Sequence, residues 1–226
     1  MCGRFTLTVS PEELQAAFPD FSIPGDIPPS YNIAPSQPIP VLANDGENKL
    51  DFFLWGLIPS WTKQDKVGQY NLINARSETA AEKASFKNSF RRRRCLILAD
   101  GFYEWSKPVR GGSKTPHYFA LKDHQPFAFA GLWDNWISPE GDPIKSACIL
   151  TISPNPLVKA VHERMPVILD PTDYQTWLDP REGKPEDFQG LMRTYPDENM
   201  VSYPVSTYVN SPKNNSPQCI QPGTLL

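Results

Sequence analysis

The chain has 226 residues, of which 39% are hydrophobic, and its formal net charge is −3. This length supports one core of ordinary size, and we expect a single domain over residues 1–226. The charge gives no global signature of a nucleic-acid binder, so any phosphate binding must come from a local patch. No apolar run approaches the ~20 residues of a membrane span and no signal-peptide pattern is present, which predicts a cytoplasmic protein, or a nuclear one in a eukaryote.

The second residue is the first chemically informative one. Met1 precedes Cys2, a small residue that cytosolic methionine aminopeptidases normally accept, so we expect the mature chain to begin at Cys2. A terminal cysteine carries an α-amine and a thiol on adjacent carbons, with ordinary pKa values near ~8 and ~8.5, so both are partly activated at neutral pH. Together they convert an aldehyde first to an imine and then to a five-membered thiazolidine. The alternative is an incidental residue at a frayed terminus.

The first half of the chain predicts helices and strands from local signals. Ser10-Pro11-Glu12-Glu13 is a capping box with proline at the first helical position, so a short helix begins there. The proline-rich stretch 21–40 is typical of a loop. Strands are expected at 39–42 and 50–57, separated by the turn Asn44-Asp45-Gly46, and a second helix across 77–90.

The second half predicts a run of strands followed by short helices. The expected strands are 95–99, 117–121, 127–133 and 146–153, with turns at Gly111-Gly112 and Glu140-Gly141-Asp142. Asn155-Pro156 opens a short helix that runs into His162, and further helices are expected at 173–178 and 187–195. The polar tail 211–226 is either disordered or held against the body of the protein.

The cysteines beyond Cys2 carry little chemical signal. They lie at positions 95, 148 and 219 and form no C-x-x-C pair. Cys95 and Cys148 stand in apolar runs typical of buried strands. The sequence indicates neither a zinc site nor a disulfide framework, and we expect no metal and no cofactor.

Two polar side chains lie at positions where an apolar core would not favour a polar residue. Glu104 ends an apolar strand between Tyr103 and Trp105, and these surroundings favour a raised pKa and an acid–base role. The alternative is a salt bridge at the rim of the fold. His162 ends a short helix, where a histidine can be a catalyst or a charge partner for the helix C-terminus.

Basic and aromatic residues suggest a nucleic-acid surface but do not establish one. The run from Arg91 to Arg94 has three interpretations: phosphate binding, a localisation signal, or a solvated helix end. Trp61 and Tyr70, in polar loops, are candidates for stacking on unpaired bases or for a peripheral place in the core.

Taken in order, the motifs resemble one family, SRAP, the SOS-response-associated peptidase domain. The resemblance covers nearly the whole chain and includes Phe86 and Thr151 as well as longer motifs. These motifs are MCGRF at 1–5, YNIAP at 31–35, WGLIPSW at 55–61, NARSE at 74–78, RRCLILADGFYEW at 93–105, FAGLW at 129–133 and HERMP at 162–166.

This resemblance implies a DNA damage response protein that captures abasic sites in single-stranded DNA covalently and shields them. In its ring-opened form an abasic deoxyribose is an aldehyde at C1′, which the Cys2 amine attacks before the thiol closes the thiazolidine. Glu104 matches the family's catalytic carboxylate, which shuttles protons during closure and reversal. His162 matches the residue that assists sugar-ring opening, and Asn74 the one that positions the amine and the lesion.

The resemblance also implies a DNA-binding surface. Arg4, Arg76 and Arg164 match phosphate-contacting positions, Trp61 and Tyr70 fall where the family places stacking aromatics, and Trp105 joins them beside Glu104. The implied partner is single-stranded DNA containing abasic sites, bound by a monomer in the bacterial cytoplasm at the nucleoid, with replication-fork proteins as candidate partners. We expect an α+β fold with a mainly antiparallel, barrel-like β core and short peripheral helices.

Three other functions are alternatives to the covalent capture of abasic sites. An N-terminal-nucleophile hydrolase would need an oxyanion hole, for which glutamine amidotransferases use an Asn-Gly pair that this chain lacks. A cysteine peptidase with a Cys2/His162 dyad would fit only self-removal of Met1 or a leader. A non-covalent reader of modified DNA would use the same basic and aromatic surface without Cys2.

Overall fold

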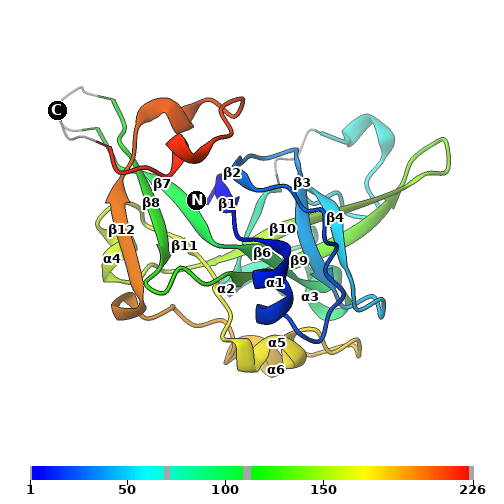
Figure 1. Ribbon diagram of the computed structural model, residues 1–226. Helices are drawn as coiled ribbons and strands as arrows, with labels where there is room; N and C mark the ends of the chain where they lie inside the picture. The colour runs from blue at the N-terminus through cyan, green and yellow to red at the C-terminus, as the bar shows by residue number, and fades with distance from the viewer. Residues whose placement is uncertain (1, 69–71, 109–112, 224–226) are drawn as a thin grey trace.

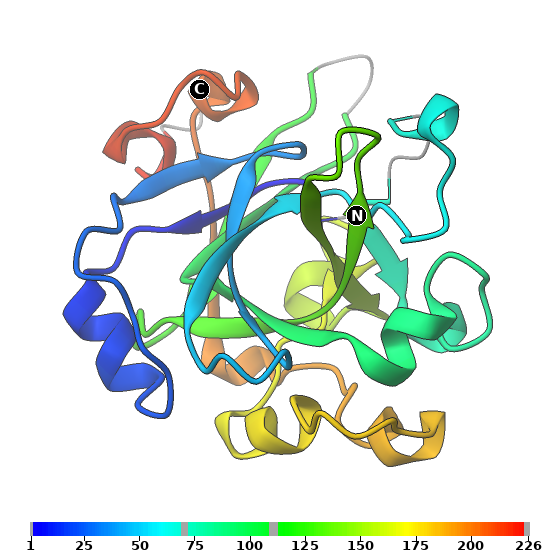
Figure 2. The ribbon, with the colours of Figure 1, turned by 90° about the vertical axis from the view of Figure 1, so that its right-hand side faces the viewer.

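A closed barrel of five strands forms the centre of the protein. The computed structural model describes residues 2–68, 72–108 and 113–223. Neighbouring barrel strands pair antiparallel except β4 and β10, which pair parallel, and the β9–β10 pairing closes the ring (Figure 2). The barrel strands are β3 (Pro38–Ala43), β4 (Leu50–Trp55), β6 (Arg94–Ala99), β9 (Phe127–Ile137) and β10 (Pro143–Ile152).

The barrel explains why its strands are so apolar. All six residues of β6 are buried, because the strand has neighbours on both faces. The ring of Phe5 packs edge-on against Trp55 and Phe129, at centroid distances of 5.1 and 5.8 Å. Strands β6 and β9 approach closely at Gly131, where the Cβ atom of any other residue would meet the Cys95 sulfur at 2.7 Å.

A second, open sheet packs against the barrel. It runs in the order β12-β8-β7-β1-β2 and every pairing in it is antiparallel. Phe102 and Phe119 stack at 5.0 Å on the face toward the barrel core, whereas Tyr103 and Tyr118 join a separate apolar cluster under the C-terminal segment. Its strands are β1 (Phe5–Leu7), β2 (Ser30–Ile33), β7 (Gly101–Trp105), β8 (Pro116–Leu121) and β12 (Met200–Pro204).

Strand β10 continues beyond the barrel and carries two short strands at its end. Residues Ile149 to Thr151 pair parallel with β5 (Asn74–Arg76), and Thr151 and Ile152 pair antiparallel with β11 (Met165–Pro166). The strands β5 and β11, which are about 90 residues apart in sequence, therefore both pair with the end of β10. This arrangement brings Asn74 and the chain just before β11 to the same end of the molecule.

Short helices surround the two sheets, and α5 and α6 lie together at the end of the molecule opposite the C-terminal segment (Figure 1). The α-helices are α1 (Pro11–Ala17), α2 (Ser77–Ala80), α3 (Lys87–Arg92), α4 (Pro156–Lys159), α5 (Tyr174–Trp177) and α6 (Pro185–Gln189). The 3₁₀ turns are η1 (Gln64–Lys66), η2 (Pro171–Asp173), η3 (Asp197–Asn199), η4 (Thr207–Asn210) and η5 (Pro217–Cys219). Within the described ranges, no helix is long and apolar enough to cross a membrane.

Most expected elements are present. The fold class is confirmed, the capping box at Ser10 forms with both of its hydrogen bonds, and Asn155 caps α4 by accepting from the backbone N–H of Val158. The expected barrel strands are β3, β4, β6, β9 and β10, each within a few residues of its predicted bounds. The turn expected at 111–112 lies outside the described residues.

Three helix predictions are wrong in extent, and one of them is the helix expected to run into His162, which ends as α4 at Lys159. The helix expected across 77–90 is divided into α2 and α3. Ala80 and Phe86 are both buried, yet six residues correspond to ~240° along a straight helix. The chain turns between them so that both reach the core. The helix expected at 187–195 begins earlier, at Pro185, and ends at Gln189.

The proline-rich stretch and the termini contain strands that the sequence did not reveal. Strand β2 occupies four residues inside the expected loop 21–40, within the proline-free run 30–34. Strands β1 and β12 are short and are stabilised by pairing with distant segments, β7 and β8 respectively. A three- to five-residue strand has too little alternation to be recognised before its partners are known.

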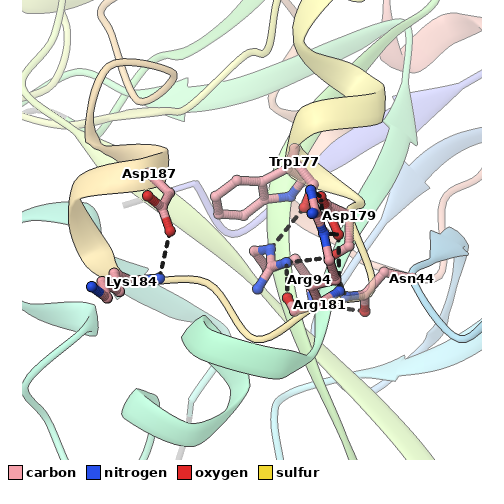
Figure 3. A network of polar contacts seen from close by, with 7 residues as sticks. All are labelled: Asn44, Arg94, Trp177, Asp179, Arg181, Lys184 and Asp187. Atoms are coloured by element: carbon pink, nitrogen blue, oxygen red, sulfur yellow. Dashed lines mark hydrogen bonds and ion pairs between the residues drawn. The ribbon is translucent and has the colours of Figure 1, made fainter.

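The arginine run is only in part a solvated helix end, because Arg91 and Arg92 end α3 in solvent whereas Arg94 has no exposed surface. Its guanidinium donates to backbone carbonyls at the ends of α3 and α5 and just beyond them, and stands 4.0 Å above the Phe188 ring. Those carbonyls belong to Phe90, Arg91, Trp177, Asp179 and Arg181. Figure 3 shows Arg94 together with Trp177, Asp179 and Arg181. The side chain points inward because the chain leaves α3 and enters the barrel at this residue.

The preceding arginines differ from Arg94 in their surroundings. Arg93 forms an ion pair with the buried Asp134, and Arg92 pairs with Glu182 at 2.7 Å on the surface. Arg91 is exposed. Part of the run is therefore structural, and it does not present four free cations to a phosphate backbone.

Candidate active site

Four segments bring the expected catalytic residues together. Cys2 precedes β1, and Glu104 lies in β7, the antiparallel partner of β1. Asn74 begins β5, and His162 lies between α4 and β11. Because β5 and β11 both pair with the end of β10, the sheets bring these residues within reach of one another although the sequence separates them.

Cys2 is an ordered and fully buried residue. Its relative exposure is 0%, and its sulfur lies 3.8 Å from the carbonyl oxygen of Arg4. The Nδ2 group of Asn74 donates to the Cys2 carbonyl oxygen at 2.8 Å. Cys2 therefore does not lie at a frayed terminus, and its chemical role stays a prediction.

The environment of Cys2 keeps its thiol protonated. Burial raises the pKa of the thiol well above its ordinary value, and the nearby carboxylate charge of Glu104 raises it further. This raised pKa belongs to the chain that still carries Met1, and the partial ionisation expected of Cys2 in the mature chain stays a prediction. A reaction at the sulfur needs a base that removes the proton as the new bond forms.

Glu104 has the properties of such a base. The residue is only 3% exposed, and burial raises the pKa of its carboxyl group to about 7. A group with this pKa can accept and return a proton near neutral pH. The side chain is buried and not exposed at the rim, and its Oε1 atom lies 3.9 Å from Nδ1 of the partly exposed His162.

His162 lies beside this carboxyl group. Its Nδ1 atom is 3.9 Å from Oε1 of Glu104, and the backbone N–H of Arg164 donates to the same Nδ1 at 3.1 Å. Burial lowers the pKa of the imidazole, so the neutral form predominates at pH 7. The same Nδ1 lies 3.1 Å from the Arg164 carbonyl oxygen, so it can accept from the Arg164 N–H in one tautomer and donate to the Arg164 carbonyl in the other. The residue follows α4 rather than ending it, and its own N–H donates to the Val158 carbonyl.

The three arginines at expected phosphate positions differ in how they are held. Arg76 is exposed at the end of β5. Arg164 forms a bidentate ion pair with Glu78, at 2.6 and 2.8 Å, and also donates to the Thr151 carbonyl at 2.5 Å. The guanidinium of Arg4 is also engaged within the protein. Of the three, Arg76 presents its charge most directly to solvent.

The aromatic residues expected to contact DNA also differ in their exposure to solvent. Trp61 is 55% exposed, which is unusual for so large an apolar ring. Trp105 is partly buried, and its indole N–H donates to Oδ1 of Asn210 at 2.7 Å. The guanidinium of Arg4 stands 5.6 Å from the Trp105 ring centroid. Tyr70 lies outside the described residues.

Sequence reasoning missed the residues that hold this site in place. Asn32, Glu78 and Asn210 all contact expected site residues, and none was identified beforehand. Asn32 and Glu78 lie inside motifs that were recognised, YNIAP and NARSE, but their contacts join segments far apart in sequence. Among the described residues, no group of three metal-ligating side chains is positioned to hold a metal ion.

Comparison with known proteins gives a consistent result. Residues 1–212 match the family model described as SOS response associated peptidase (SRAP). The chain is 46% identical to a Bacillus subtilis protein named abasic site processing protein YoqW, over 98% of this chain and 99% of that one. It is 34% identical to the chicken protein named abasic site processing protein HMCES, over 98% of this chain and 78% of that one.

Solved structures share the fold. A crystal structure of a Bacteroides thetaiotaomicron protein superposes with a TM-score of 0.87 at 24% identity, covering 99% of this chain and all of that one. A Bordetella bronchiseptica protein superposes with a TM-score of 0.78 at 27% identity, covering 91% and 100% of the two chains.

Proposed function

Because the chain belongs to the SOS response associated peptidase family, we propose that it acts in the DNA damage response by capturing abasic sites covalently through Cys2. In this proposal Met1 is first removed, and the exposed amine and thiol of Cys2 form a thiazolidine with the aldehyde of the lesion. The substrate is single-stranded DNA, and the protein acts as a monomer and a single domain in the bacterial cytoplasm.

One observation supports this function above the others. Cys2 is buried between Asn74, which binds its carbonyl at 2.8 Å, and Glu104, whose pKa of about 7 suits proton transfer at neutral pH. A non-covalent DNA reader has no need of a buried thiol at the N-terminus or of a carboxyl group with this pKa. An aldehyde is the electrophile on which an adjacent amine and thiol act in sequence.

The first step is opening of the sugar. An abasic deoxyribose is mostly a closed hemiacetal, so the O1′ proton must leave and O4′ must gain one before the aldehyde is free. The neutral ring of His162 can accept the O1′ proton and, as the imidazolium, give a proton to O4′ while the C1′–O4′ bond breaks. We assign His162 this role because its ring is partly exposed beside Glu104.

The second step joins the amine to C1′. The neutral Cys2 amine adds to the aldehyde carbon, and loss of one water molecule gives the imine. The hydrogen bond from Asn74 to the Cys2 carbonyl holds the residue that carries the amine. Asn74 therefore acts as a positioning residue, which restricts the amine to the approach that the lesion requires.

The third step closes the ring. The Cys2 thiol is protonated, so ionised Glu104 accepts its proton as sulfur adds to the imine carbon, and then gives the proton to the imine nitrogen. Glu104 returns to its starting state, and one C–S bond has formed without any oxidant or reductant. The same transfers in reverse, with water, release the aldehyde.

DNA binding is supplied by the surface around this site. Arg76 would contact phosphate, and Trp61 would stack beside the base-free nucleotide, where stacking compensates for the missing base. Arg4, Arg164 and Trp105 complete this surface in the proposal. In this proposal, any peptidase activity serves to expose the amine of Cys2.

Covalent capture is testable with single-stranded DNA that carries one abasic site. We expect the wild type to form an adduct that survives denaturing electrophoresis, and Cys2→Ala to form none that is stable. Cys148→Ala is the matched control, because it removes a buried thiol from the barrel strand β10. A Cys2→Ala protein that forms the adduct as the wild type does would disprove the thiazolidine mechanism.

A second arm tests the requirement for a free amine. A form with residues added before Cys2 should bind the same DNA without forming the adduct. Crosslinking by such an extended, unprocessed form would show that the amine is not the first nucleophile.

A further inference from the structure

The C-terminal segment is ordered and packed near the reactive strand, although the mechanism above makes no use of it. We call residues 206–223 the strap. It contains η4 and η5, and in Figure 1 it lies over the end of the open sheet that holds β1, β2 and β7. Val209 and Cys219 of the strap are fully buried in the apolar cluster with Tyr103 and Tyr118.

Asn32 of β2 binds the strap to the N-terminal strand. The side chain is 2% exposed, and its Nδ2 group contacts three strap carbonyls, those of Val209, Ser211 and Asn214, at 3.2, 3.0 and 2.7 Å. Its Oδ1 atom accepts from Nη1 of Arg4 at 2.6 Å. One buried amide therefore joins the strap to Arg4.

The strap also contacts Arg4 directly. The carbonyl oxygen of Val209 accepts from Nη1 of Arg4 at 2.8 Å. The Arg4 backbone carbonyl is in turn the acceptor for the Tyr103 N–H at 2.9 Å and the nearest acceptor to the Cys2 sulfur, at 3.8 Å. The position of Arg4 is thus shared between the strap and the nucleophile.

A second strap contact reaches the proposed DNA surface. Oδ1 of Asn210 accepts from the indole N–H of Trp105 at 2.7 Å, and Arg4 stands over the same ring at 5.6 Å. The strap therefore holds both members of this cation–π pair, Arg4 through Asn32 and Val209, and Trp105 through Asn210.

We infer that the strap is a working part of the site, with Asn32 and Asn210 as positioning residues. Asn32 positions the Cys2 nucleophile through Arg4, and Asn210 positions Trp105 toward the DNA. This inference rests on the proposed function, because it assigns the strap a role in capture of the lesion.

The structure allows this role to be separated from simple stabilisation. Closer to its C-terminal end, the strap is also held by the Tyr203 hydroxyl, which donates to the Ile220 carbonyl at 2.9 Å, and by the Gly223 N–H, which donates to the Pro204 carbonyl at 2.8 Å. Tyr203→Phe removes one of these hydrogen bonds without changing a contact of Arg4 or Trp105. It is the matched control for Asn32→Ala.

The experiment measures adduct formation with abasic single-stranded DNA over a range of DNA concentrations, well below the Tm of each variant. For Asn32→Ala we expect the rate at saturating DNA to fall about tenfold, because a small displacement of a nucleophile has a large effect on rate. For Tyr203→Phe we expect a rate within about twofold of the wild type, even where its Tm falls.

Asn210 provides a test that does not depend on a buried residue. Asn210 is exposed, so its variants should fold. Asn210→Ala should raise the half-saturating DNA concentration about threefold with little change in maximal rate, and Asn210→Asp, which keeps an oxygen acceptor, should restore it. In NMR spectra the Trp105 indole N–H resonance should move in Asn210→Ala and stay near its wild-type position in Asn210→Asp.

Three outcomes would overturn the inference. The first is wild-type maximal rates in Asn32→Ala together with wild-type half-saturation in Asn210→Ala. The second is an equal loss of rate in Asn32→Ala and Tyr203→Phe, which would mean that only stability matters. The third is a wild-type protein that forms no adduct, which would remove the proposed function as well. A wild-type adduct with unchanged variants removes this inference alone.

Discussion

Arg94 and Glu104 are both ionisable side chains with almost no exposed surface, at 0% and 3%. Burial disfavours the charged form of each, so it lowers the pKa of Arg94 to about 10 and raises the pKa of Glu104 to about 7. At neutral pH the arginine therefore stays charged, whereas the carboxyl group is divided between its two forms.

The difference comes from what surrounds the two groups. Arg94 directs its N–H groups at backbone carbonyls near the ends of α3 and α5, where the helix dipoles favour a cation. Glu104 lies beside a protonated thiol and a neutral imidazole, groups that exchange protons themselves. Burial of a charge is thus no sign of function by itself. A protonation state balanced near neutral pH is the more informative feature.

The largest effect we predict comes from Arg94→Met. This substitution leaves several buried carbonyl oxygens without a donor, and it should reduce the free energy of unfolding by about 3–5 kcal/mol. The Tm should fall by roughly 6–20 °C in thermal unfolding followed by circular dichroism. At temperatures where the variant is folded, adduct formation should proceed at the wild-type rate.

Arg91→Met is the control for this prediction, because Arg91 is an exposed neighbour in the same run. Its free energy of unfolding should change by less than about 0.5 kcal/mol. An Arg94→Met protein with the wild-type Tm would show that the buried guanidinium is not needed for stability.

Glu104→Gln should slow adduct formation without lowering stability, which is the reverse of the effect expected for Arg94→Met. The amide keeps the size of the side chain but cannot accept the thiol proton, so adduct formation should slow by a factor of about 10² to 10³ while the Tm is kept or raised. Release of a preformed adduct should slow as well. Both rates are measured by quenching the reaction at a series of times and separating the adduct from free DNA on denaturing gels.

Glu163→Gln is the matched control, since Glu163 is next to His162 in sequence and its side chain is 82% exposed. Its variant should form the adduct at the wild-type rate. Comparable losses in Glu104→Gln and Glu163→Gln would mean that negative charge near the site matters, and not proton transfer by Glu104.

The smallest predicted effect is on the pH dependence of stability. The pKa of Glu104 near 7 lies above its ordinary value of 4.5, so the folded protein binds this proton more tightly than the unfolded chain. The resulting stabilisation is complete below pH ~4.5 and is lost as the pH rises through ~7, a change of roughly 2–3 kcal/mol. The Glu104→Gln variant lacks this pH-dependent contribution to the free energy of unfolding.

Urea unfolding of the wild type and Glu104→Gln at pH 5 and pH 8 measures this difference. The wild type should lose free energy of unfolding relative to Glu104→Gln between the two pH values. Arg94 should contribute nothing over this range, because its pKa of about 10 lies above it. Parallel changes in both proteins would contradict a carboxyl group that titrates near 7.

How far the sequence predicts the fold depends on the range of the interactions. The capping box of α1, the Asn155 cap of α4 and the long strands β6, β9 and β10 follow from local patterns, and they are present as expected. Strands β1, β2 and β12 depend on partners far along the chain and were missed. The division of the expected helix 77–90 reflects a core that both Ala80 and Phe86 must reach.

The candidate site shows the same limit. The chemical types at Cys2, Asn74, Glu104 and His162 are visible in the sequence, because motif and residue identity do not depend on folding. The sequence did not reveal that Arg4 and Arg164 are already bound by Asn32 and Glu78, or that Arg94 is buried. Those facts depend on contacts between segments about 30 to 90 residues apart.

By itself, then, the sequence determined the family, the fold class and the presence of a cysteine at position 2. Only the tertiary structure decided the protonation states of Cys2 and Glu104, because a pKa depends on burial and on neighbouring charges that folding brings together. Only the tertiary structure, too, placed the C-terminal strap against Arg4, since that contact spans 205 residues of chain.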